Sequence, residues 1–131
     1  MSNLPTSVAV DVPATPDHVQ VLRNVAAGVA TRLDMPIDQI EEVRLAVTEA
    51  ASLLLEEVEA TSLRMTIGRD GDRLDVTLST DGRVDPWPTD RVLASWPWLV
   101  MKGLTDEVRA DRGDGAGPSI TFTKGRERVG R

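Results

Sequence analysis

Two alternating segments joined by an Asp-Gly-Asp turn constrain the fold of this chain most. Apolar and polar residues alternate along both 62–68 and 72–79, as in strands that bury one face. The apolar positions are Leu63, Met65 and Ile67 in the first segment and Leu74, Val76 and Leu78 in the second. Asp70-Gly71-Asp72 between them is typical of a tight hairpin connection. The sequence therefore predicts an antiparallel pair with one apolar face.

Further elements flank this hairpin on both sides. A strand is predicted over 6–12, a closing strand over 119–124 and loops over 81–90 and 111–119. Three helices are predicted, from Thr15-Pro16 to Leu33, from about Pro36–Asp38 to Val58, and over roughly 91–109.

The expected starts of the first two helices rest on capping residues. Thr15 is expected to act as N-cap with Pro16 in the first helical position, and Asp38 and Glu41 have the spacing of a capping box. The element order β-α-α-β-β-α-β predicts an α+β fold, a two-layer α/β sandwich with all helices on one face of the sheet.

Composition limits the classes of function. The 131 residues fit one domain, predicted over 1–125 with a flexible tail over 126–131. A net charge of −6 argues against direct DNA binding and weakly favours a basic protein partner. The chain has no cysteine, no apolar run long enough for a membrane span, and an N-terminus unlike a signal peptide. We therefore expect a cytoplasmic protein that does not bind membranes.

Glu49 stands out in the second helix. On a helical wheel it falls at the border between the apolar arc and the wet face. It could be a catalytic base, a partner for a cation, or an exposed rim carboxylate, and glutamates are rarely buried. His18, the one histidine, supports no zinc site or Ser-His-Asp triad, and the glycines at 113, 115 and 117 lack the Gly-Lys-Ser/Thr of a phosphate loop.

The three tryptophans form a second unusual group. Trp96 and Trp98 are two positions apart, so on a helix they project to nearly opposite sides. One reading places one of them in the core and the other over a loop. The alternative is an exposed aromatic anchor at a protein interface.

Three segments resemble one known family in the same order. "IEEVRLAVTEAASLLLEE" (40–57) resembles the N-box helix of the GHKL ATPases, in their anti-sigma factor/serine-protein kinase (RsbW-like) branch. "LTDEVRAD" (104–111) resembles the end of that family's third-helix region, and "SITFTK" (119–124) resembles its last strand. The resemblance covers about residues 6–125 and implies a mixed, mostly antiparallel sheet.

The resemblance implies roles for two residues of the second helix. In the family, the glutamate matching Glu49 helps to activate the attacking hydroxyl. The asparagine matching Leu53, one turn later, coordinates the Mg²⁺ that bridges the ATP phosphates. A leucine offers no oxygen to a hard cation, so the resemblance implies no metal site here.

The nucleotide motifs also depart from the family. Its Asp-x-Gly-x-Gly motif, aligned through 84–86, puts the adenine-binding aspartate on Ser79 and the glycines on Asp81 and Arg83. A shift of two residues would restore an acidic side chain. A second Gly-x-Gly falls on Ser95, Trp96 and Pro97, where proline has no N–H to donate, and the ATP lid is short.

The resemblance therefore implies two competing functions. The first is an anti-sigma factor that sequesters an alternative sigma factor without ATP and is released by a STAS-type anti-anti-sigma partner. The second is an active serine kinase that uses ATP and Mg²⁺, with Glu49 as base. A degenerate domain with another protein partner is a third reading, and the family is commonly dimeric.

Overall fold

The structure is a computed structural model that describes residues 7–112 and 117–126. In chain order its elements are β1 (Val8–Pro13), the 3₁₀ helix η1 (Pro16–His18), α1 (Val19–Arg32), α2 (Ile37–Glu57), β2 (Ser62–Asp70), β3 (Arg73–Thr80), α3 (Asp90–Leu93), α4 (Trp96–Leu104), β4 (Glu107–Arg112) and β5 (Pro118–Gly125).

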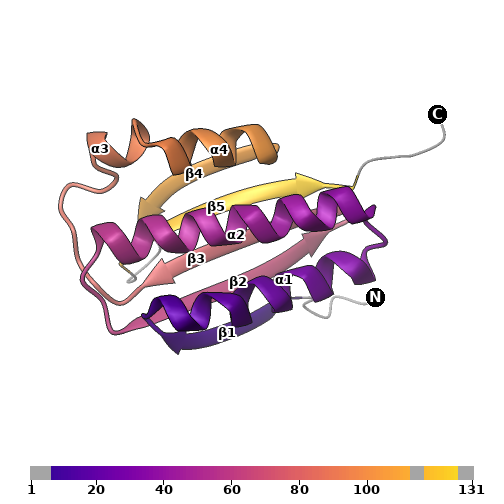
Figure 1. The fold of residues 1–131 in the computed structure, drawn as a ribbon, viewed down its shortest axis with the longest axis horizontal. Helices are drawn as coiled ribbons and strands as arrows, with labels where there is room; N and C mark the ends of the chain where they lie inside the picture. The colour runs from indigo at the N-terminus through magenta and orange to yellow at the C-terminus, as the bar shows by residue number, and fades with distance from the viewer. Residues whose placement is uncertain (1–6, 113–116, 127–131) are drawn as a thin grey trace.

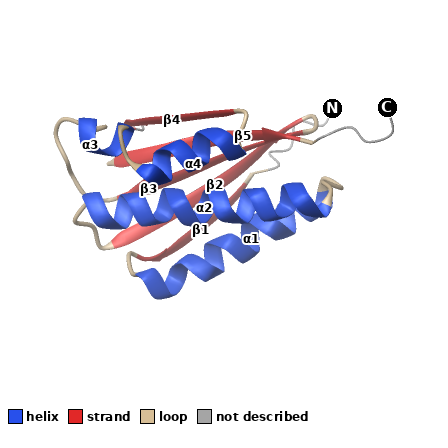
Figure 2. Cartoon of the chain, turned by 45° about the horizontal axis from the view of Figure 1, so that its top comes forward, coloured by secondary structure: helices blue, strands red, loops and turns tan. Residues whose placement is uncertain are grey.

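The strands form one five-stranded sheet in the order β1-β2-β3-β5-β4. All four pairings are antiparallel, so the sheet is not the mixed one that was expected. Helices α1, α2 and α4 lie together over one face of the sheet (Figures 1 and 2). The predicted α+β two-layer sandwich with helices on one face is confirmed.

The central hairpin forms as predicted. Met65 pairs with Leu78, and Asp70 pairs with Arg73 across the turn. Gly71 has a φ of 63°, a left-handed conformation that suits glycine in a tight hairpin turn. The alternate apolar residues of β2 and β3 are buried toward the helices, so the pattern fixed both the pairing and the buried face.

The predicted third helix is wrong beyond residue 104. The segment contains the short α3, then α4, and then β4, which is an additional edge strand. Thr105 ends α4, with its hydroxyl donating to the carbonyl of Met101 at 2.7 Å. The backbone N–H of Asp106 already donates to Thr123 of β5 at 2.9 Å. Val108 follows Leu104 at helical spacing, which made this strand resemble a continued helix.

Of the two capping predictions, the capping box of the second helix is wrong. The N-cap of α2 is Pro36, without a side-chain cap, and its carbonyl accepts from the N–H groups of Gln39 and Ile40. Glu41 instead lies 3.7 Å from Arg44, so no capping box forms. Thr15 is the N-cap of η1 and Pro16 is its first residue, as predicted, although regular α-helix begins only at Val19. The Thr15 hydroxyl hydrogen-bonds His18 Nδ1 at 2.8 Å instead of capping a backbone N–H.

The two faces of the sheet differ in chemistry. Toward the helices, side chains of all three long helices and of the strands form one hydrophobic core. The other face is mainly polar, and there the hydroxyls of Thr77 and Thr121 lie 2.9 Å apart. In the described ranges, no helix is both long enough and apolar enough to cross a membrane.

The end of the chain is described as far as Arg126, whose backbone N–H donates to Asp72 at 2.8 Å. Residues 127–131 of the predicted tail lie outside the described part, as does most of the Gly-rich segment, 113–116.

Candidate functional site

Helix α2 places Glu49 and Leu53 in different surroundings although they are one turn apart. Leu53 is 2% exposed and belongs to the hydrophobic core. Glu49 is half buried, and its carboxylate has no hydrogen bond or ion pair with any described residue. The predicted border position of Glu49 is therefore observed, and Leu53 one turn later offers only a buried hydrocarbon side chain.

The first turn of α4 is capped by residues of the same segment. The Ser95 hydroxyl accepts from the N–H of Trp98 at 3.3 Å and donates to the carbonyl of Val92 at 2.7 Å. Pro97 lies in the first turn and has no N–H. Of the N–H groups that a helix start leaves unpaired, one is absent and another is taken by the N-cap.

Asp81 follows β3 and binds the residues at the start of β2. Its Oδ1 accepts from the backbone N–H groups of Thr61 at 2.9 Å and Ser62 at 3.1 Å, and its Oδ2 accepts from the Thr61 hydroxyl. These hydrogen bonds, led by that from the Thr61 hydroxyl, lower the pKa of Asp81 from 3.8 to about 2. Both carboxylate oxygens are thus engaged in tying β3 to β2.

Two glycines let the chain pack closely beside Asp81. A Cβ on Gly82 would lie 2.3 Å from the carbonyl oxygen of Glu59, and one on Gly117 would lie 2.3 Å from that of Gly82. The N–H of Gly117 donates to the carbonyl of Thr80 at 3.1 Å. Sequence reasoning missed this packing, although an Asp-Gly pair directly after a strand was a signal for it.

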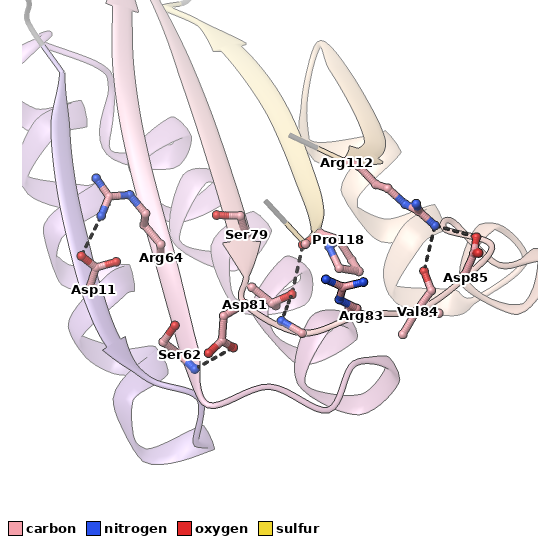
Figure 3. A pocket seen from close by; sticks show the side chains of 13 residues that line it. Asp11, Ser62, Arg64, Ser79, Asp81, Arg83, Val84, Asp85, Arg112 and Pro118 are labelled. Atoms are coloured by element: carbon pink, nitrogen blue, oxygen red, sulfur yellow. Dashed lines mark hydrogen bonds and ion pairs between the residues drawn. The ribbon is translucent and has the colours of Figure 1, made fainter. Parts of the chain in front are cut away.

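A hollow of about 610 Å³ lies at these strand ends (Figure 3). Its lining includes three aspartates and three arginines, namely Asp11, Asp81, Asp85, Arg64, Arg83 and Arg112. Most of these charges are already paired. Arg64 lies 2.7 Å from Asp11, and Arg112 lies 2.7 Å from Asp85. Arg83 is exposed and has no hydrogen-bond partner among the described residues (Figure 3).

The structure divides the predicted site residues into separate groups. Ser79, Asp81 and Arg83 line this hollow together, with Ser79 on the sheet face away from the helices. Glu49 and Leu53 lie on α2, and Ser95 and Pro97 lie at the start of α4. None of the latter four lines this hollow or a second one of about 670 Å³ between α1 and α2.

The second hollow was not predicted. It is lined by Arg23 of α1 and by Thr48, Ser52 and Glu56 of α2, and the Arg23 Nε is buried without a partner. Within the described ranges, no group of three or more His, Cys, Asp or Glu side chains is arranged to hold a metal ion.

Comparison with known proteins gives a consistent result. The model of the histidine kinase-like ATPase domain matches residues 12–124. The serine-protein kinase RsbW of Bacillus subtilis (strain 168) is 26% identical, over 98% of this chain and 92% of that protein. RsbW of Bacillus licheniformis is 24% identical over 89% of this chain and 85% of that protein. RsbW of Bacillus cereus (strain ATCC 10987 / NRS 248) is 26% identical over 93% of this chain and 88% of that protein.

Proposed function

The chain belongs to the histidine kinase-like ATPase domain family as an RsbW-like member, and on that premise we propose that it is an anti-sigma regulator that works without ATP. It sequesters an alternative sigma factor by protein contact in the cytoplasm. A STAS-type anti-anti-sigma protein releases that sigma factor by competition, and the regulator acts as a homodimer.

The burial of Leu53 in the core is the observation that supports a function without ATP. The family resemblance implies that the Mg²⁺ of an ATP complex takes an oxygen ligand from this position of the helix. Phosphoryl transfer depends mainly on positioning and on charge neutralisation by the metal. The Leu53 side chain has no oxygen and is buried in the core. Rotating α2 to expose another residue there would remove Leu53 and its neighbours from the core, which is unfavourable.

The start of α4 and Asp81 support the same conclusion. Pro97 removes one N–H that could face a phosphate, and Ser95 already accepts from Trp98. Asp81, the acidic residue that a two-residue shift would align with the adenine ligand, has both oxygens engaged by Thr61 and Ser62. This residue set does not suit ATP with Mg²⁺.

A serine kinase is the second candidate. The relatives carry that name, and Glu49 is half exposed and without a partner among the described residues, as a base requires. The kinase reading needs ATP to bind in a way that does not use an asparagine at residue 53.

Thermal melting separates the two functions. ATP or ADP with Mg²⁺ at 1,000 times its dissociation constant would stabilise the fold by about 4 kcal/mol, a rise in Tm on the order of 10 °C. We expect no rise at millimolar nucleotide beyond that given by Mg²⁺ with tripolyphosphate, which controls for ionic effects. A nucleotide-specific rise would refute the ATP-independent function.

Co-purification from the native host tests the partner. The tagged chain is expected to capture a sigma factor, and adding a STAS-domain protein is expected to displace it without added ATP. Absence of a sigma factor from the captured proteins, with the chain itself folded, would contradict the regulatory role.

A further inference from the structure

The outer surface of α4 is apolar although nothing in the described structure covers it. Trp96 is 73% exposed and Leu99 is 57% exposed, while Trp98 and Met101 on the opposite side of the helix are buried. Trp96 and Leu99 are three positions apart and therefore share one helical face. Among the described residues seven large apolar side chains are exposed, and Trp96 and Leu99 are, with Ile37, the three most exposed of them.

Helix α2 runs alongside α4 in the opposite direction (Figures 1 and 2). At one end Arg91 of α3 lies 3.4 Å from Glu57, the last residue of α2. At the other end the Lys124 ammonium lies 2.7 Å from both Glu42 of α2 and the carbonyl of Leu104, the last residue of α4. The two helices therefore present one continuous outer surface.

The edge of α2 that follows α4 is acidic. Glu42, Glu49 and Glu56 are spaced by seven residues, so they share nearly one face of the helix. Because Glu42 meets Lys124 beside the end of α4, the start of this row lies on the α4 side, and Glu56 at its other end also lines the hollow between α1 and α2. Glu49 and Glu56 have no ion-pair partner among the described residues, and Leu45 between the first two glutamates is 43% exposed.

We propose that this surface, formed by Trp96 and Leu99 of α4 with Glu49 and Glu56 of α2, docks a basic amphipathic helix of a partner protein. The apolar stripe of that helix packs on Trp96 and Leu99, and its Lys or Arg side chains pair with the glutamates. Aromatic residues commonly anchor such contacts, and an amphipathic helix fits a helix-lined surface. The inference goes beyond the proposed function, since it names a surface and a chemistry whatever the partner's identity.

Charge decides among the possible occupants. A second copy placed symmetrically on the same surface would bring the two acidic edges together, which is repulsive. Anionic lipid and nucleic acid phosphates are repelled for the same reason. A basic helix is the occupant whose charge is complementary.

The probe for this surface is an 18-residue peptide of leucine and lysine, with leucines in one helical stripe. Trp87 and Trp98 are only 8% and 7% exposed, so acrylamide quenching of the intact chain reports mainly on Trp96. The peptide is expected to lower the quenching constant at least twofold. A peptide of the same composition in scrambled order is expected to leave it unchanged.

Matched variants locate the surface. Leu99→Ser and the double variant E49Q/E56Q are each expected to weaken peptide binding at least tenfold. Val21→Ser, a comparably exposed apolar residue on α1, and Glu107→Gln, an exposed glutamate on β4, are expected to change it less than twofold. Melting curves of all four variants verify that each one is folded.

Several outcomes overturn the proposal: no binding of the striped peptide, equal binding of the scrambled one, or a loss in Val21→Ser that equals the loss in Leu99→Ser. Protection of Trp96 by raising the protein concentration alone would make the occupant a second copy. Sigma-factor capture by a chain that does not bind the striped peptide would refute this surface and keep the proposed function. Peptide binding by a chain that captures no sigma factor would do the reverse.

Discussion

Asp81 shows how a single residue can act structurally within a stretch that resembles a nucleotide motif. Its carboxylate accepts from two backbone N–H groups and one hydroxyl at the start of β2. Such bonds favour the ionised form, so the pKa is lowered to about 2 in the folded chain. The sequence showed an acidic residue after a strand, but its partners 19 and 20 positions earlier became visible only in the folded chain.

We predict that Asp81→Asn lowers stability at pH 7 and changes the acid unfolding profile. A carboxyl group with a depressed folded pKa contributes stability above its unfolded pKa of about 4 and loses that contribution as pH falls toward 2. The stability difference between the parent chain and Asp81→Asn should therefore shrink between about pH 4 and pH 2. Urea unfolding at several pH values measures this difference.

Asp17→Asn provides the control for that series, because Asp17 is exposed and has no hydrogen bond to another described residue. Its profile should follow that of the parent chain. A constant difference between the parent and Asp81→Asn across this pH range would contradict the assigned role.

At the scale of elements, Lys124 of β5 links the sheet to the helices α2 and α4. It extends from β5 to the carbonyl at the end of α4 and to Glu42 on α2, and its side chain is only 12% exposed. The carbonyl of Leu104 is one of the groups that a helix end leaves without a partner inside the helix. The lysine therefore satisfies the end of α4 and pairs with a glutamate at the same time.

We predict that Lys124→Met destabilises the fold by about 1–3 kcal/mol, because hydrogen bonds of a charged, largely buried group are lost. The substitution should increase the rate of amide hydrogen exchange more in α4 than in α1. Lys102→Met, at an exposed position of α4 without a partner among the described residues, is the control and should change stability by less than about 0.5 kcal/mol. Equal effects of the two substitutions would show that Lys124 does not fasten α4.

The elements also show which sequence signals were sufficient. The period-two pattern of β2 and β3 and the long helical pattern of α2 predicted their type and approximate extent, because each lies within one contiguous segment. β4 was missed because an edge strand of six residues with charges on its exposed side has little apolar pattern. The predicted capping box at Asp38 does not form because α2 begins at Ile37 with Pro36 as its N-cap. Asp38 therefore lies inside the first turn of the helix.

At the scale of the whole molecule, the helices and the sheet share one hydrophobic core. Buried residues of α1, α2, α4 and of the strands belong to a single cluster, which includes Trp87 and Trp98. We predict cooperative, two-state unfolding, as is usual for a single core of this size. Tryptophan fluorescence and far-UV circular dichroism should give the same midpoint in urea. Separate midpoints would show that the region around α4 unfolds as a distinct unit.

The sequence by itself determined the chemistry available at each position and the local periodicities. It was enough to show that residue 53 offers no oxygen and residue 97 no N–H, and to predict a hairpin covered by helices. Tertiary structure decided what depends on distant partners. It buries Leu53, turns Ser79 to the outer face of the sheet, engages Asp81 with Thr61 and leaves Trp96 exposed. The physical reason is that periodicity is a property of neighbours along the chain, whereas burial and hydrogen bonding depend on which segments the fold brings together.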